Sequence, residues 1–373
     1  MSSAELPADQ SGLTTDALLA GPRGRSLCAN LLNGRLASPG GRVRKAWAEA
    51  QQYLRAGDTT RWVGKLAECT AIAGLPGTPF DGSALMTGLL AAVDSAAYWQ
   101  VPDTEDQGFA GEAAREALRP VAEAVVAATR ISDLRWWTAP VDRGLQRYAQ
   151  FTGQHALPEP PLAGAAKSVG AWLADTLNDE RSAGDRPEDP AAPYGGRWWS
   201  SPALSGLLVT TRALPGLGAA GLALVEDGLG WQSARCWPVE LRDGARVYEV
   251  SGRSHWAALV ERYPLDVSKS RRHDWWRATG HVGRWLIPDY AAMAADWDAV
   301  HVSVTGYLTT AGIAISADGT ARTMLAGWDP DATWWLNDVL SLASPPQEWR
   351  ADDQVPNGWT LAGESKAPTL SCA

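Results

Sequence analysis

The chain has 373 residues, 45% of them hydrophobic and 20% charged, with a formal net charge of -9 and a pI of about 5.1. The length predicts two domains, and the composition excludes a disordered chain. The acidic balance argues against a protein whose main role is to coat nucleic acid. The four cysteines form no C-x-x-C pair, so neither a disulfide framework nor a cysteine zinc site is expected, and we interpret them as small buried hydrophobic side chains or an incidental tail thiol.

The N-terminal half has the apolar spacing of helices. The ranges that carry it are 42–56, 59–73, 83–99, 111–129 and 165–177. Pro120 is expected to kink or break the fourth helix. Short connections favour antiparallel packing, so we expect a helical domain over residues 1–180.

An acidic, proline-rich stretch over residues 178–196 then marks the predicted domain boundary. Beyond it the pattern changes to short segments, which predict an α+β domain over residues 195–373 with an antiparallel or mixed sheet. The expected strands are 207–211, 222–226, 233–239, 246–250, 300–305 and 321–325. The expected helices are 254–262, 289–297 and 331–340, with Ser254 capping the first and Asp329 or Asp331 capping the last.

The second domain is also rich in tryptophan, since fourteen of the twenty tryptophans lie at or after Trp198. Indoles suit places where an apolar wall meets a polar group, so we expect a pocket in this half. The segment Tyr194-Gly-Gly-Arg-Trp-Trp-Ser-Ser-Pro, followed by Val209-Thr-Thr-Arg, resembles the Gly-Gly-Arg-Trp segment of RES-domain proteins in the ADP-ribosyltransferase-like superfamily. The resemblance covers about twenty residues, and Trp199 stands where that family usually has Asn.

The resemblance implies an NAD-using enzyme that cleaves the nicotinamide–ribose bond. Breaking this bond passes through a cationic ribosyl state, which needs a phosphate-binding arginine, a carboxylate and an aromatic wall. In this hypothesis Glu249 is the catalytic carboxylate, with Glu226 in reserve. The cofactor-binding candidates are Arg197, Trp198, Trp199, Ser200, Ser201 and Arg271. The two arginines would bind phosphate, an indole would stack on nicotinamide, and the serines would shape the pocket.

Other motifs point to less specific chemistry. Gly216-Leu-Gly-Ala-Ala-Gly221 matches a dinucleotide fingerprint, but Pro215 precedes it and a strand is expected after it, so we interpret it as coincidence. The histidines after residue 250 have no metal-ligand spacing, and no metal site is expected. In the segment 300–305, alternation would place His301, Ser303 and Thr305 on one face, either as a cleft wall or as a solvated surface.

The segment 269–285 mixes arginines with indoles and could hold a nucleotide or single-stranded nucleic acid, or could be a basic loop anchored by its tryptophans. Two alternatives to the NAD enzyme therefore stay open. One is an adaptor or immunity-type interaction protein with a tryptophan-rich surface, and the other is a nucleotide or nucleic-acid-binding module. A small nucleotide is the expected ligand, nucleic acid is not favoured, and the helical domain could recognise a protein target or cover the active site. No segment predicts a signal peptide or a membrane span, so a cytoplasmic location is expected.

Overall fold

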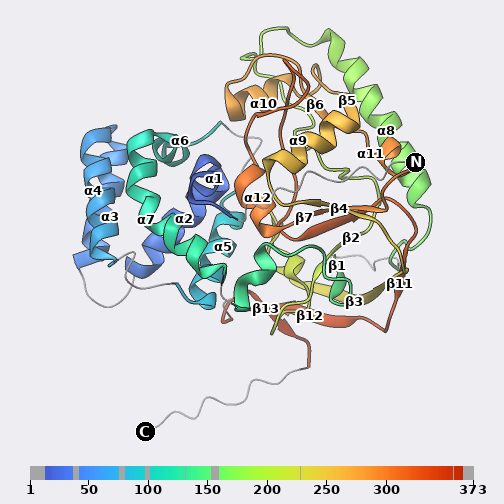
Figure 1. Cartoon of the computed structure of the whole chain (residues 1–373), viewed down its shortest axis with the longest axis horizontal. Helices are drawn as coiled ribbons and strands as arrows, with labels where there is room; N and C mark the ends of the chain where they lie inside the picture. The colour runs from blue at the N-terminus through green and yellow to red at the C-terminus, as the bar shows by residue number, and fades with distance from the viewer. Residues whose placement is uncertain are drawn as a thin grey trace.

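The computed structural model describes residues 13–36, 42–74, 80–96, 101–130, 132–152, 159–226, 228–355 and 357–363. Helices gather at one end of the molecule, and a mixed sheet with further helices forms the other end (Figure 1). The predicted α+β class with a helical N-terminal part is confirmed. Of the helices in these ranges, none combines the length and the apolar character that a bilayer crossing requires.

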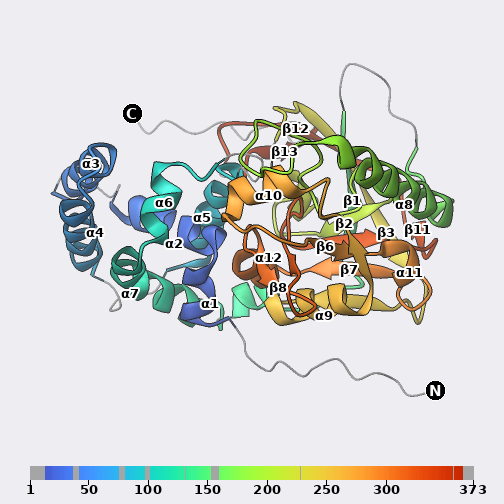
Figure 2. The same cartoon turned by 90° about the horizontal axis from the view of Figure 1, so that it is seen from above.

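The helical part is built from short amphipathic helices with capped ends. Asp58, Asp81 and Asp103 each accept a hydrogen bond from a backbone N–H in the first turn of the following helix. The helices are α1 (Thr15–Ala20), α2 (Pro22–Leu36), α3 (Arg42–Arg55), α4 (Thr59–Ile72), α5 (Gly82–Asp94), α6 (Thr104–Ala110) and α7 (Glu112–Ala128). In both views α3 and α4 lie farthest from the sheet (Figures 1 and 2).

The predicted helices of this part agree with α3, α4 and α7 to within one or two residues at each end. Pro120 lies inside α7 without ending it, because the helix continues to Ala128. The predicted helix 83–99 corresponds to α5, and its last three residues lie outside the described residues. Helix α2, on which the candidate site depends, lies in the part predicted as helical but was not predicted as an individual helix.

The all-helical segment ends earlier than expected. Strand β1 (Gln146–Thr152) falls within the range predicted as helical, and it pairs on both sides with strands of the C-terminal part. Helix α8 (Ala165–Ser182) runs five residues past its predicted end and contacts α11 (Tyr290–Met293), where the rings of Trp172 and Tyr290 lie 5.0 Å apart. Strand β1 and helix α8 therefore belong to the C-terminal part, because their partners lie in strands β2 and β3 and in helix α11.

Among the described residues the main sheet has nine strands, in the order β13-β12-β3-β1-β2-β10-β7-β4 with β11 added beside β3. Only the pair of β4 and β7 is parallel in the described sheet. The strands after β1 are β2 (Val209–Arg212), β3 (Ser233–Leu241), β4 (Val247–Val250), β7 (Ala299–Val302), β10 (Ala332–Trp335), β11 (Leu340–Leu342), β12 (Gln347–Ala351) and β13 (Trp359–Leu361). Two small hairpins join β5 (Pro264–Asp266) to β6 (Leu286–Pro288) and β8 (Ile315–Ser316) to β9 (Arg322–Thr323).

One face of the sheet packs against helices. Tyr248, Val250, Val300, Val302 and Trp334 alternate onto this face and join the main hydrophobic core. The helices of the C-terminal part besides α8 and α11 are α9 (Arg253–Arg262), α10 (Arg272–Thr279) and α12 (Val304–Thr310). Helices α9 and α12 contact β4 and β7 respectively, and α12 also contacts α1 and α2, so the core continues from the sheet into the helical part.

Several predicted elements of the C-terminal part are wrong. The range 222–226 is not a strand, since only the short 3-10 turn η3 (Ala220–Leu222) stands there. The range 331–340 is not a helix, because β10 and the start of β11 occupy it. The predicted strand 300–305 ends at Val302, and the side chain of Ser303 instead caps α12 by accepting from the Gly306 N–H. Ser254 lies inside α9, whose N-cap is Gly252.

The cysteines confirm the expectation of small buried hydrophobic side chains. Cys28, Cys69 and Cys236 are free and buried, and burial raises the pKa of Cys236 to about 12. Cys372 lies outside the described residues.

Candidate functional site

The predicted cofactor-binding arginines are held by carboxylates of α8. Arg197 forms ion pairs with Asp175 and, at 3.8 Å, with Asp179. Arg271, which is 2% exposed, donates from Nη1 to Asp179 at 3.0 Å and from Nε to the Trp199 carbonyl at 3.3 Å. These contacts join α8, the 194–201 loop and the start of α10, so both guanidinium groups already have partners within the protein.

The serines of the same segment are buried, and the tryptophans beside them are half-buried. Ser200 is fully buried, where it exchanges backbone and side-chain hydrogen bonds with Ala326 and accepts from the Tyr290 hydroxyl at 2.9 Å. The Trp198 carbonyl accepts from the Trp275 indole. The backbone at Gly327 lies close to Trp199, because a Cβ at Gly327 would lie 2.6 Å from the Cβ of Trp199. The segment is therefore held by contacts within the protein.

Ser201 is 1% exposed, and its hydroxyl has no hydrogen-bond partner among the described residues. The segment 197–201 and Arg271 thus lie together, and their contacts connect α8 to the start of α10.

Glu249 lies on the opposite face of the sheet. Its side chain shares a face with His301 of β7 and Thr333 of β10, to which it is aligned by strand register. The next residue, Trp334, points to the other face, where it contacts Trp328, which in turn neighbours Tyr290 and hence Ser200. The sheet itself separates Glu249 from the Arg197 segment, and the predicted single site is not formed.

Glu249 instead belongs to a group that we call the sheet network, consisting of Glu249, His301, Asp331 and Arg212. His301 is fully buried, with Nδ1 2.5 Å from the Glu249 carboxylate and Nε2 3.4 Å from Asp331. Arg212 donates to Asp331 from its backbone N–H at 2.8 Å and from Nε at 2.6 Å. Burial opposes protonation of His301, but hydrogen bonds to Asp331 and Glu249 outweigh it and raise the His301 pKa to about 9.

The segment between η1 (Ser132–Trp137) and β1 covers this network. The Val141 N–H donates to Glu249 at 3.0 Å, the Pro140 carbonyl accepts from Arg212 at 3.3 Å, and the Trp136 ring lies 5.4 Å from the same guanidinium. Asp331, predicted as a turn or helix cap, has a left-handed φ of 62° and is 1% exposed. Both imidazole nitrogens are engaged, so the network holds the covering segment on the sheet and offers no free base.

The segment 269–285 is also engaged internally. Of its three tryptophans, Trp275 and Trp285 are at most 1% exposed and Trp276 is half-buried. Arg272 donates to the Pro187 carbonyl at 2.7 Å, and Arg284 forms an exposed ion pair with Asp266 at 3.1 Å. The anchored-loop interpretation describes this segment best, although residues 272–279 form the helix α10. The glycine motif at residues 216–221 ends in the 3-10 turn η3 and does not begin an α-helix. This agrees with the interpretation that its match to the dinucleotide-binding fingerprint is a coincidence.

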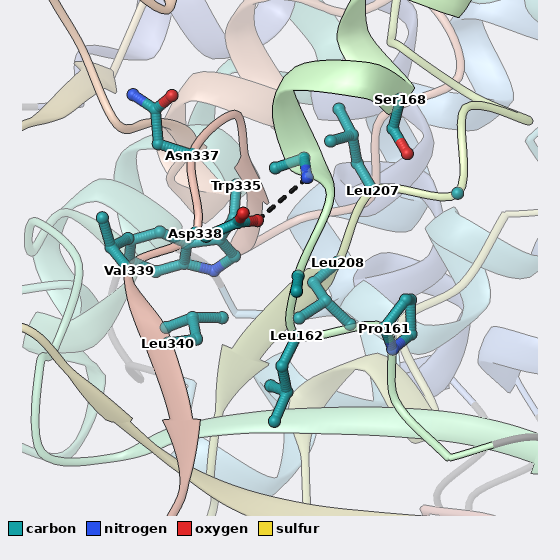
Figure 3. Close-up of a pocket in the computed structure, with 13 residues that line it drawn as sticks. Pro161, Leu162, Ser168, Leu207, Leu208, Trp335, Asn337, Asp338, Val339 and Leu340 are labelled. Atoms are coloured by element: carbon teal, nitrogen blue, oxygen red, sulfur yellow. Dashed lines mark hydrogen bonds between the residues drawn. The ribbon is translucent and has the colours of Figure 1, made fainter.

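A further pocket of the C-terminal part is small. Figure 3 shows the pocket beside the start of α8, where Asp338 accepts from the backbone N–H groups of Gly164 and Ala165. Its volume of about 10 Å³ is close to the minimum for one water molecule. It is therefore a helix-capping site and too small for a cofactor.

A larger cavity, which we call the junction cavity, lies between the two parts of the molecule and has a volume of about 580 Å³. Its walls are the start of α2 and α6 on one side, and the end of α10 and the residues after α12 on the other. The described charged side chains of its lining are Arg23, Arg25, Arg277 and Asp106. Ile313 and several alanines supply an apolar wall, so the cavity is cationic on one side and apolar on the other.

Two of these arginines have carboxylate partners. Arg23 is 4% exposed and lies 3.3 Å from Glu226, which also accepts from Tyr307 of α12. Arg277 pairs with Asp274 and donates to the Tyr194 carbonyl at 2.7 Å. The Arg23–Glu226 pair joins α2 to the C-terminal part, whereas the contacts of Arg277 stay within the C-terminal part.

Arg25 differs because its hydrogen bonds go to neutral groups. It is 9% exposed, and its Nη1 donates to the carbonyls of Leu19 and Ala20 at 3.1 and 2.9 Å, at the end of α1. Its Nε has no hydrogen-bond partner among the described residues. Burial lowers the Arg25 pKa to about 10, partly offset by the Asp106 charge. Gly24 permits this placement, because a Cβ there would lie 1.9 Å from the Leu18 carbonyl oxygen.

Sequence reasoning missed Arg25 because α2 itself was missed. Pro22 at the first helical position and the leucines at 27, 31 and 32 were the available signal.

Comparison of the chain with protein-family models, with curated proteins and with solved structures finds no match. The candidate site therefore rests on its own geometry.

Proposed function

We propose that this protein binds a small organic anion of the nucleotide class in the junction cavity, with Arg25 as the main anion-binding group. A volume of about 580 Å³ falls within the range of small-molecule sites, and such sites are common between domains. Three arginines against one carboxylate in the described lining favour a phosphate or a carboxylate on the ligand.

The observation that carries this proposal is the incomplete pairing of Arg25. A guanidinium group withdrawn from water is costly unless its donors are satisfied. Among the described residues the Nε of this side chain is buried without a partner, and the two acceptors of Nη1 are uncharged. A phosphate or carboxylate bound in the cavity would place beside this guanidinium a negative charge that the neutral carbonyls do not supply.

The NAD-cleaving hypothesis loses its geometric basis. Arg197 and Glu249 lie on opposite faces of the sheet, so they cannot act on one dinucleotide within this arrangement. NAD remains a nucleotide to be tested in the junction cavity. Nicotinamide release from NAD that disappears in Glu249→Gln would restore the enzyme hypothesis.

The tryptophan-rich interaction surface is not supported either. From Trp198 onward, every tryptophan in the described ranges is buried or half-buried. Large exposed apolar side chains such as Leu204 and Leu229 are isolated in sequence, which is normal for a soluble surface.

The test is thermal unfolding in the presence of AMP, ADP, NAD or orthophosphate. A ligand at one hundred times its Kd stabilises the folded state by about 2.7 kcal/mol, which raises the Tm by several degrees. Arg25→Gln should weaken nucleotide binding by about ten- to a hundredfold, because a hydrogen bond to a charged group is lost. Ala110→Trp, at an exposed position of the lining, should block the cavity without changing Arg25.

Arg235→Gln is the matched control. It removes an arginine of β3 that pairs with Glu348, and neither residue lines the junction cavity. It should leave nucleotide binding unchanged. Equal stabilisation of the wild type, Arg25→Gln and Ala110→Trp by nucleotides would overturn the proposal.

A further inference from the structure

A second cavity, which we call the helical cavity, adjoins the junction cavity inside the helical part. It has a volume of about 370 Å³ and lies between α2, α3 and α6. Pro22, Arg25 and Asp106 line both cavities. The side chain of Arg25 therefore contributes to the walls of both cavities, which adjoin at this residue.

The two cavities have opposite charge preferences. The described charged side chains of the junction cavity are three arginines and one aspartate. Those of the helical cavity are Arg25 and Arg55 against Asp103, Glu105 and Asp106. An anionic group is thus favoured in the first chamber, and a group that donates hydrogen bonds is favoured in the second.

The amides of the helical cavity show the same preference for donors. Asn30 donates from Nδ2 to the Ser26 carbonyl at 2.9 Å, and Gln51 donates from Nε2 to Glu105 at 3.0 Å. Each amide nitrogen thus already donates to the protein, and each amide oxygen is an acceptor on a residue that lines the cavity. An acceptor-lined chamber recognises amino or ring N–H groups.

Trp47 adds an aromatic surface to this chamber. It is half-buried on α3 and lines the cavity together with Phe109. An indole provides a flat face on which a nucleobase can stack, whereas a simple ammonium group or a free phosphate would make little use of it.

The geometry points to a nucleotide whose base carries an exocyclic amino group, with its phosphate beside Arg25 in the junction cavity and its base beside Trp47 and Gln51 in the helical cavity. This inference rests on the proposed function and specifies its ligand. It assigns to α3 a role in choosing the base, separate from the role of Arg25 in holding the anion.

Titration calorimetry with four probes tests the assignment: AMP, IMP, ribose 5-phosphate and orthophosphate. AMP and IMP differ at the amino group of the purine, and ribose 5-phosphate lacks the base. The wild type should bind AMP about tenfold more tightly than IMP, corresponding to one hydrogen bond. Ribose 5-phosphate should bind more weakly than either.

Gln51→Ala should remove the preference for AMP over IMP and leave the affinity for ribose 5-phosphate unchanged. Gln52→Ala is the matched control, because Gln52 is the exposed neighbour on α3 and does not line the described cavity. Alanine is the best helix former, so both variants should fold, and their thermal unfolding without ligand checks this.

The outcomes separate the two proposals. Equal affinity for AMP, IMP and ribose 5-phosphate, with each weakened by Arg25→Gln, would overturn the base assignment and leave the anion site intact. Binding of none of the four probes would overturn both. A wild-type preference for AMP that survives in Gln51→Ala would show that the base is recognised elsewhere.

Discussion

The junction cavity and the sheet network both hold buried arginine, but they differ in how its charge is satisfied. Arg212 in the sheet network donates to Asp331 twice, and His301 connects Asp331 to Glu249. Within the described residues, Arg25 donates to two carbonyls and its buried Nε has no partner, while the side chain lines an open cavity. Buried charge by itself therefore does not indicate a ligand site, and we infer one only where the pairing is incomplete beside a cavity.

The largest expected effect is the loss of Asp331. Asp331→Ala leaves Arg212 and His301 buried without their shared partner, which should cost about 3–5 kcal/mol of the free energy of unfolding. Denaturant titration measures it, with Asp318→Ala at an exposed position as the control. A loss of less than about 1 kcal/mol would contradict the interpretation that the sheet network stabilises the fold.

The pH dependence of stability should be the next largest effect. The folded pKa of His301, about 9, lies above its unfolded value, so the stabilisation is complete below pH of about 6.5 and is lost as the pH rises through 9. The full amplitude is on the order of 3 kcal/mol. It should appear as the difference between wild type and His301→Gln measured from pH 6 to pH 10. This difference also removes the effect of the buried cysteines, which titrate in the unfolded chain over the same range. A constant difference would mean that His301 does not gain a proton on folding.

The smallest of these effects on stability should come from Arg25→Gln in the absence of ligand. The substitution loses hydrogen bonds to two neutral carbonyls and relieves an incompletely satisfied buried charge, so the net cost should be about 1 kcal/mol. Denaturant titration of this variant beside Arg55→Gln, an arginine of the helical cavity lining, measures it. A cost equal to that of Asp331→Ala would show that Arg25 is structural, and the contrast between the two regions would fail.

Prediction from sequence succeeded where the signal was local. The spacing of Trp62, Leu66 and Cys69 predicts α4 correctly, because successive helix turns bring these residues onto one face. Strands β3 and β4 were also found from their alternation. The candidate site was not found, since Arg25 on α2 looks like any helical arginine until α1 and α6 close around it.

The fold class, the main helices of the N-terminal part and the core character of the cysteines were predictable, because these depend on composition and on contacts a few residues apart. The pairing of β1 with the sheet and the left-handed conformation of Asp331 bound to Arg212 became visible in the folded molecule alone. The same holds for the positions of Glu249 and Arg197 on opposite faces. These features escape prediction because strand pairing and burial are set by residues distant in sequence, and a shift of one position along a strand changes the face to which a side chain points.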